Sequence, residues 1–231
     1  MSSVPLPRRL AAEFFGTFIF VLVGAGSAVG SASLSSPNSG TLLLVSALGN
    51  GIGLAVAVTA TLKISGGALN PAVAVGLWVG KKLPPREAIL YVFVEVVGAT
   101  AAGVALVASF PSVLGNNAKW GSPILGQGLS DLQGIAIEAL LTFVLVIVVY
   151  GTAVDPRAPH VGGIGIGLAL LGSVLVAGNL TGAALNPARA LGPMIAGGFY
   201  PGYWYIYIIG PVVGAILAAL VYHYLLENPS D

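Results

Sequence analysis

Two near-copies of one eight-residue phrase constrain this chain more than any other feature. The first copy covers residues 65–72 and the second covers residues 181–188, with six of the eight positions identical. The copies start 116 residues apart, which is about half of the 231-residue chain. Interrupted segments at corresponding places in two halves of a membrane protein indicate a site near the bilayer midplane. The phrase therefore predicts two related halves that meet at a transport site.

Composition indicates a protein of the lipid bilayer. The chain is 56% hydrophobic and 7% charged, whereas a soluble domain has about 25% charged residues. The net charge of +1, from scattered basic residues, gives no indication of nucleic-acid binding. The sequence has no cysteine, which excludes a disulfide and a thiolate metal site. We expect no catalytic residue, no metal and no cofactor.

Six apolar stretches are near the roughly 20 residues that cross about 30 Å of hydrocarbon as a helix. They lie at residues 9–30, 41–62, 86–109, 132–153, 161–179 and 203–226. Two shorter pieces, 70–80 and 186–197, each begin at Asn-Pro. About ten helical residues reach only about 15 Å, so neither piece can cross alone. The prediction is an all-α membrane protein with six transmembrane helices and two re-entrant half-helices.

Basic residues set the predicted orientation. Threading six spans places seven of the nine basic residues on one side of the membrane, namely Arg8, Arg9, Lys63, Lys81, Lys82, Arg86 and Arg157. The opposite side has only Lys119 in a loop. Because Lys and Arg favour cytoplasmic loops, we expect a multi-pass protein of the cell membrane with both termini in the cytoplasm.

The two halves, residues 1–115 and 116–231, are predicted to form three spans each within a single channel domain. Residues 91–98 also resemble residues 203–210, at an offset of 112. Because three is an odd number, the second half must enter the membrane upside down. The repeat is therefore expected to be inverted about an axis in the membrane plane.

The repeated phrase predicts two short helices that begin at the same triplet. The triplets are Asn70, Pro71 and Ala72 in the first copy and Asn186, Pro187 and Ala188 in the second. Asn is a favoured helix cap, and Pro is favoured at the first helical position. Inversion brings the two amino ends together, each with a partial charge of about +0.5. The two Asn amides would then donate hydrogen bonds to a neutral molecule, while cations are repelled.

Arg189 lies three residues after Asn186, where the first copy has Val73. A charged residue at membrane depth is costly and usually faces a functional cavity. We place Arg189 at a constriction toward the extracellular side, where it adds to the barrier against cations and protons.

These residues closely resemble the aquaporin, or major intrinsic protein, family over nearly the whole chain. The resemblance is carried by residues 12–17, 65–73, 186–189 and 210–214. It implies an aquaporin-like inverted repeat with one pore per subunit, assembled as a homotetramer. It also implies that Glu13 and Glu138 brace the two re-entrant loops by accepting backbone hydrogen bonds.

The family's selectivity filter has four positions, which are counted from the motifs. They fall on Asn50, Val174, Ala183 and Arg189. Water-specific members resemble one another in having an aromatic residue and a His where this chain has Asn50 and Val174. Ala68 also stands where most members have His, and Ala190 stands where glycerol-type members have Asp. The resemblance implies a wider filter that passes small neutral solutes, such as glycerol or ammonia, besides water.

Two other functions stay open at this stage. An ion-coupled secondary transporter of a small solute also uses inverted repeats, and Glu13, Glu95 and Glu138 could form its proton relay. A membrane enzyme has less support, since the sequence contains no nucleophile–base pair, metal cluster or phosphate loop. A passive channel for water and small neutral solutes is the preferred hypothesis.

Overall fold

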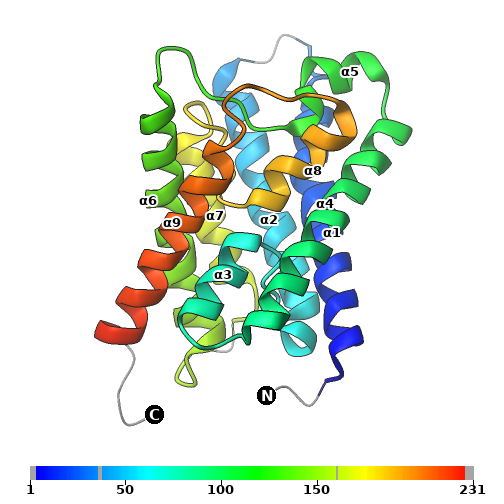
Figure 1. Cartoon of the computed structure of the whole chain (residues 1–231). Helices are drawn as coiled ribbons and strands as arrows, with labels where there is room; N and C mark the ends of the chain where they lie inside the picture. Colours follow the sequence, from blue (N-terminus) through cyan, green and yellow to red (C-terminus); the bar gives the residue numbers. More distant parts are fainter. Residues whose placement is uncertain (1–3, 36–37, 160, 227–231) are drawn as a thin grey trace.

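The computed structural model describes residues 4–35, 38–159 and 161–226, and the regular elements among them are all helical (Figure 1). Five helices are long and apolar enough to cross a membrane. They are α1 (Leu6–Ser31), α2 (Ser39–Ser65), α4 (Pro85–Ser109), α6 (Asp131–Val149) and α9 (Ile206–Val221). Both α6 and α9 continue into a π-helical turn, η2 (Tyr150–Val154) and η3 (Tyr222–Leu226) respectively. The start of α1 and the end of α9 lie at the same end of the molecule (Figure 1).

The fifth predicted span is shorter than the sequence suggested. Residues 161–179 were expected to be helical, but α7 covers only Ile164–Ala177, which is 14 residues. Such a helix is roughly 21 Å long. Gly162 before it and Gly182 after it both have a positive φ, of 59° and 83°, which a right-handed helix cannot include. The chain therefore leaves α7 early and turns directly into the second copy of the repeated phrase.

The two half-helices form as predicted. Helix α3 covers Pro71–Val79 and α8 covers Pro187–Gly197, and each has an extended Asn as its amino-terminal cap. The Asn70 side chain accepts a hydrogen bond from the Ala72 N–H at 2.9 Å, and Asn186 accepts one from the Arg189 N–H at 3.1 Å. In Figure 1, α3 lies toward the end where α1 begins, and α8 lies toward the opposite end.

The outer faces of the spans are apolar, as expected in a bilayer, and charged and amide side chains are buried among the helices. Large hydrophobic side chains are exposed on the outer faces of the spans, including Phe93 of α4, Leu140 of α6 and Val176 of α7. Buried polar side chains lie between the helices instead, and they are Glu13, Asn50, Asn70, Glu95, Glu138, Asn186 and Arg189 among others. Because charge is costly in hydrocarbon, this distribution indicates a lipid-facing exterior with buried polar groups kept between the helices.

Matching contacts relate the two halves, and they correct one expectation. The Tyr91 hydroxyl donates to the Ser65 carbonyl at 2.9 Å, and the Tyr207 hydroxyl donates to the Thr181 carbonyl at the same distance. Tyr91 therefore corresponds to Tyr207, an offset of 116 residues rather than 112. The sequence comparison was wrong by one helical turn because it matched aromatic residues without knowing which one reaches the loop. The predicted division between residues 115 and 116 falls inside α5 (Ser112–Asn117), and it stays a prediction.

Candidate functional site

The amino ends of the two half-helices are joined directly at the centre of the molecule. The Asn70 Nδ2 donates to the Leu185 carbonyl at 2.9 Å, and the Asn186 Nδ2 donates to the Leu69 carbonyl at 2.8 Å. Each side-chain oxygen caps its own helix, while each amide nitrogen bonds to the loop of the other half. An Asn amide has two N–H donors, so one donor remains on each side for a molecule in the pore.

The two loops before the half-helices have the same strained backbone. Three positions in each loop adopt a positive φ, and they correspond pairwise as Gly66 with Gly182, Gly67 with Ala183, and Leu69 with Leu185. A left-handed conformation costs a residue other than Gly roughly 1–2 kcal/mol. Strain of this kind persists only where the surroundings hold the backbone in place, which is common at functional sites.

Two buried carboxylates hold this strained backbone. Each accepts two backbone N–H bonds from the loop of its own half. The donors are Ala68 (3.1 Å) and Leu69 (2.7 Å) for Glu13, and Ala184 (3.0 Å) and Leu185 (2.8 Å) for Glu138. Glu138 also accepts a bond from the Thr181 hydroxyl at 2.7 Å. These contacts support the predicted bracing role of both carboxylates.

Glu95 has no comparable role. It is fully buried in α4, close to Glu13, and neither of its carboxylate oxygens has a hydrogen-bond partner within the described residues. At the offset of 116 its counterpart in the second half is Pro211, which lies inside α9. Glu95 is therefore a feature of one half only, unlike the two bracing glutamates.

Arg189 is held in a fixed orientation on the first turn of α8. Its Nε donates to the Asn50 Oδ1 at 3.0 Å, and its Nη1 donates to the Gly121 carbonyl at 2.8 Å. Asn50 is itself fixed, because its Nδ2 donates to the Ser46 carbonyl at 2.8 Å. The Nη2 atom bonds to no other described residue, which leaves it as a donor for a permeating molecule.

A cavity of about 450 Å³ opens at Arg189, at the end of the molecule opposite the start of α1. Ser46, Asn117, Gly121, Ser122 and Gly182 are among its lining residues. The cavity thus leads from the molecular surface to the guanidinium group.

Of the four predicted filter residues, a side-chain hydrogen bond joins two. Asn50 and Arg189 are hydrogen-bonded to each other, as described above. Val174 on α7 and Ala183 in the loop are buried, at 0% and 2% exposure. Gly178, one turn beyond Val174, and Gly182, next to Ala183, line the cavity together with Arg189. The place of Val174 and Ala183 in the filter stays a prediction that this arrangement supports.

The contact between the Gly121 carbonyl and Arg189 was not predicted from the sequence. It reaches Arg189 because the chain forms a tight turn, η1 (Lys119–Gly121), in which Trp120 and Gly121 both have a positive φ. The Trp120 indole packs into the protein and donates to the Asn116 side chain at 3.2 Å. A Gly after a Trp in a loop is a weak turn signal, and it could not have indicated which group the turn would contact.

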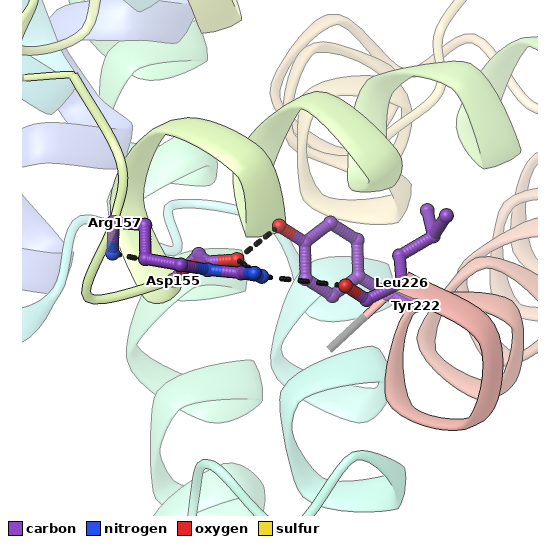
Figure 2. A network of polar contacts seen from close by, with 4 residues as sticks. All are labelled: Asp155, Arg157, Tyr222 and Leu226. Atoms are coloured by element: carbon purple, nitrogen blue, oxygen red, sulfur yellow. Dashed lines mark hydrogen bonds and ion pairs between the residues drawn. The ribbon is translucent and has the colours of Figure 1, made fainter. Parts of the chain in front are cut away.

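The sequence analysis also did not predict a polar network at the end of the molecule opposite the Arg189 cavity (Figure 2). Asp155 accepts hydrogen bonds from the Tyr222 hydroxyl at 2.8 Å and from the Arg157 Nη2 at 2.6 Å. Arg157 also donates to the Leu226 carbonyl at 3.3 Å. The Arg157 guanidinium, together with the other donors, holds the pKa of the Asp155 carboxyl well below its usual value. The network ties the loop after α6 to the end of α9.

A second tyrosine connects this end to the first half-helix. The Tyr150 hydroxyl donates to the Gly76 carbonyl of α3 at 3.0 Å. The rings of Tyr150 and Tyr222 lie 5.0 Å apart, so the α3 contact and the Asp155 network adjoin each other.

Comparison with known proteins agrees with this geometry. The family model described as major intrinsic protein matches residues 1–222. Aquaporin AqpM of Methanothermobacter marburgensis is 38% identical, covering 97% of this chain and all of the relative. Aquaporin TIP4-4 of Zea mays is 40% identical, covering 93% of this chain and 85% of the relative.

A solved structure has the same fold. The X-ray structure of the aquaglyceroporin from Plasmodium falciparum superposes with a TM-score of 0.85, covering 96% of this chain and 97% of that chain at 22% identity. The joined half-helices, the braced loops and the match over almost the entire sequence lead to one conclusion. The chain belongs to the major intrinsic protein family, whose aquaporins are membrane channels and not enzymes.

Proposed function

We propose that the protein is a passive channel that conducts water and small neutral solutes and excludes ions and protons. One observation carries this proposal, namely the direct junction of the two half-helix amino ends through Asn70 and Asn186. Both helix dipoles place positive partial charge at this point, which repels cations. The free amide hydrogens can donate to the oxygen of a neutral molecule and thereby orient it.

Selection by size and polarity is assigned to Arg189 with Asn50, Val174 and Ala183. The guanidinium adds a fixed positive charge and one free donor group beside two small apolar side chains. Asn50 contributes no ring, so the opening is expected to admit solutes larger than water. Because the structural relative is described as an aquaglyceroporin, glycerol is the first solute to test, followed by ammonia.

The proposed setting is the cell membrane, with both termini in the cytoplasm and four copies forming a homotetramer. The basic residues Lys63, Lys81 and Lys82 lie at the same end as the start of α1, which supports this orientation. The tetramer rests on the family relationship, because one pore per subunit leaves the outer faces free to pack against further copies.

The absence of cysteine makes a specific test possible. Purified protein is reconstituted in proteoliposomes, and water efflux is followed by stopped-flow light scattering after a hyperosmotic jump. We expect faster shrinkage than in empty vesicles, and faster swelling in a glycerol gradient. The Ser46→Cys variant introduces one thiol in the cavity at Arg189. A thiol reagent should block its water flow, and a reductant should restore it.

The matched control is Leu44→Cys, on the exposed outer face of the same helix. The reagent should leave water flow through this variant unchanged. Folded, inserted protein that shrinks no faster than empty vesicles would refute the channel. Equal block of both variants would show that the water path lies elsewhere.

A further inference from the structure

A second cavity of about 710 Å³ lies at the end of the molecule where α1 begins and α2 ends. It is separate from the pore residues Asn70, Asn186 and Arg189, none of which lines it. Its walls come from the first turns of α1 and α4, the last turn of α2 and the turn after α3. The residues used below are Lys63, Ile64, Trp78, Lys81, Lys82 and the pair Arg9 and Glu87.

The lining is strongly basic. Among the described residues that line the cavity, Glu87 is the one acidic residue, and Arg9 binds it through two hydrogen bonds of 2.5 and 2.8 Å. The two charges of this ion pair neutralise each other, and the pair links α1 to α4 at one side of the cavity. Lys63 and Lys81 line the cavity as further basic residues and carry the positive charge that the argument uses.

The backbone turn after α3 holds Lys81 and Lys82 in place. Lys81 adopts a left-handed conformation with a φ of 60°, which is costly for a residue with a side chain. The turn is closed by the Lys82 N–H, which donates to the Leu77 carbonyl at 2.8 Å, and by the Lys81 N–H, which donates to the Trp78 carbonyl. A left-handed residue is a common way for a helix to end, and the closed turn fixes the backbone at Lys81 beside the cavity.

The cavity also has an apolar edge. Trp78 is 47% exposed and Ile64 is 39% exposed, and both line the cavity beside the lysines. Tryptophan beside lysine is typical of the layer where lipid headgroups meet the hydrocarbon. A ligand that fits both parts has an anionic head for the lysines and an apolar chain that continues along the outer surface.

We propose that this cavity binds the phosphate-bearing head of an anionic phospholipid from the leaflet on the side of the chain termini. Basic pockets between helices are the arrangement by which membrane proteins recognise such heads. Lys63 from α2 and Lys81 from the turn after α3 bind the phosphate from two sides. Trp78 and Ile64 contact the start of the acyl chains. The lysines and the apolar side chains of this site are not among the proposed pore residues Asn70, Asn186 and Arg189.

Native mass spectrometry of the detergent-solubilised protein tests the site. Phosphatidylglycerol, phosphatidylcholine and inorganic phosphate are titrated separately, and the bound species are counted. The Lys63→Gln/Lys81→Gln variant removes two charges from the cavity. Each basic residue near an anionic surface contributes roughly a fivefold factor, so phosphatidylglycerol should bind about 25-fold more weakly. The matched control is Arg8→Gln/Arg86→Gln, which removes two exposed charges at the same end but outside the cavity.

The proposal expects tighter binding of phosphatidylglycerol than of phosphatidylcholine, and a control variant within about twofold of the wild type. Equal weakening in both variants, or no preference between the two lipids, would overturn it. Displacement of the lipid by millimolar inorganic phosphate would instead assign the site to a soluble anion. If the double variant does not fold, Lys63→Gln alone should weaken binding about fivefold. Water flow should be unchanged in every variant, so a failed channel and a failed lipid site give different results.

Discussion

At the scale of single residues, the filter depends on how Arg189 is held. Counting from the motif placed Asn50 in the filter but could not show that its oxygen bonds to the Arg189 Nε, because that contact joins residues 139 positions apart. Two of the proposed filter residues, Asn50 and Arg189, are therefore hydrogen-bonded to each other.

Replacing Asn50 by Leu should leave the Arg189 Nε as a buried donor without a partner. The expected cost is about 1–3 kcal/mol of stability, together with a changed ratio of glycerol to water flow, because the guanidinium is no longer fixed. Thermal unfolding in detergent and stopped-flow permeability measure the two effects. Asn50→Asp keeps the acceptor oxygen and should retain most of the stability. Equal losses in both variants would show that the hydrogen bond is not what matters.

Replacing Arg189 by Val should weaken proton exclusion. Removing the guanidinium deletes the fixed charge at the constriction, while the half-helix dipoles at Asn70 and Asn186 remain. We therefore expect a measurable proton leak with water flow maintained. A pH-sensitive dye inside proteoliposomes records the leak after an external acid pulse. Arg189→Lys keeps a positive charge and should leak less than Arg189→Val. An identical leak in the wild type and Arg189→Val would remove this role from Arg189.

At the scale of helices, sequence patterns predicted which helices exist better than they predicted where each helix ends or what it contacts. The long spans and both half-helices could be predicted because hydrophobic length and Asn-Pro caps are local signals. The early end of α7 and the π-helical turns after α6 and α9 could not, because they depend on tertiary contacts. The loop braces at Glu13 and Glu138 came from the family resemblance, whereas the Gly121 carbonyl and the Asp155 network had no local signal.

Close helix crossings depend on glycine at one matching position in each half. A Cβ on Gly98 would lie 2.4 Å from the Phe14 carbonyl oxygen, and one on Gly214 would lie 2.1 Å from that of Ala139. Gly214→Ala should therefore push α9 away from α6 and cost about 1–3 kcal/mol. Gly30→Ala in α1 is the control, since nothing lies within 4 Å of its added Cβ. Stability against unfolding is measured by detergent titration. Gly30→Ala should be at least as stable as the wild type, and Gly214→Ala should be less stable. A Gly214→Ala variant that is as stable as Gly30→Ala would contradict the crossing geometry.

The network at Asp155 should make the end of α9 sensitive to acid. The pKa of this carboxyl is lower in the folded protein than its ordinary value of about 3.9. Its contribution to stability is thus complete above about pH 4 and is lost as the pH falls through the lowered pKa. Melting temperatures of the wild type should approach those of Asp155→Asn between pH 5 and pH 2. A difference that stays constant over this range would show that the carboxylate charge has no part in the network.

At the scale of the whole molecule, the pore is built jointly by the two halves. Helix α2 packs on α7, α3 on α9, and α4 on α8, so each half covers surfaces of the other. The hydrogen bonds of Asn70 and Asn186 also cross between halves. A half on its own would lack one half-helix and leave the strained loop of the other exposed.

This joint construction predicts the behaviour of a split chain. The backbone can be cut after Gly128, which has a φ of 81° and nothing near its Cβ position, in the loop before α6. Residues 1–128 and 129–231, expressed together, should reassemble and conduct water, because the contacts between halves do not depend on that loop. Each fragment alone should not conduct, since the first lacks Asn186 and Arg189 and the second lacks Asn70 and Asn50. Conduction by one fragment, measured by stopped flow after confirmed insertion, would mean that a single half forms a pore and would contradict this joint construction. Reassembly without conduction would place the missing function in the turn that brings Gly121 to Arg189, which Trp120→Gly in the intact chain would test separately.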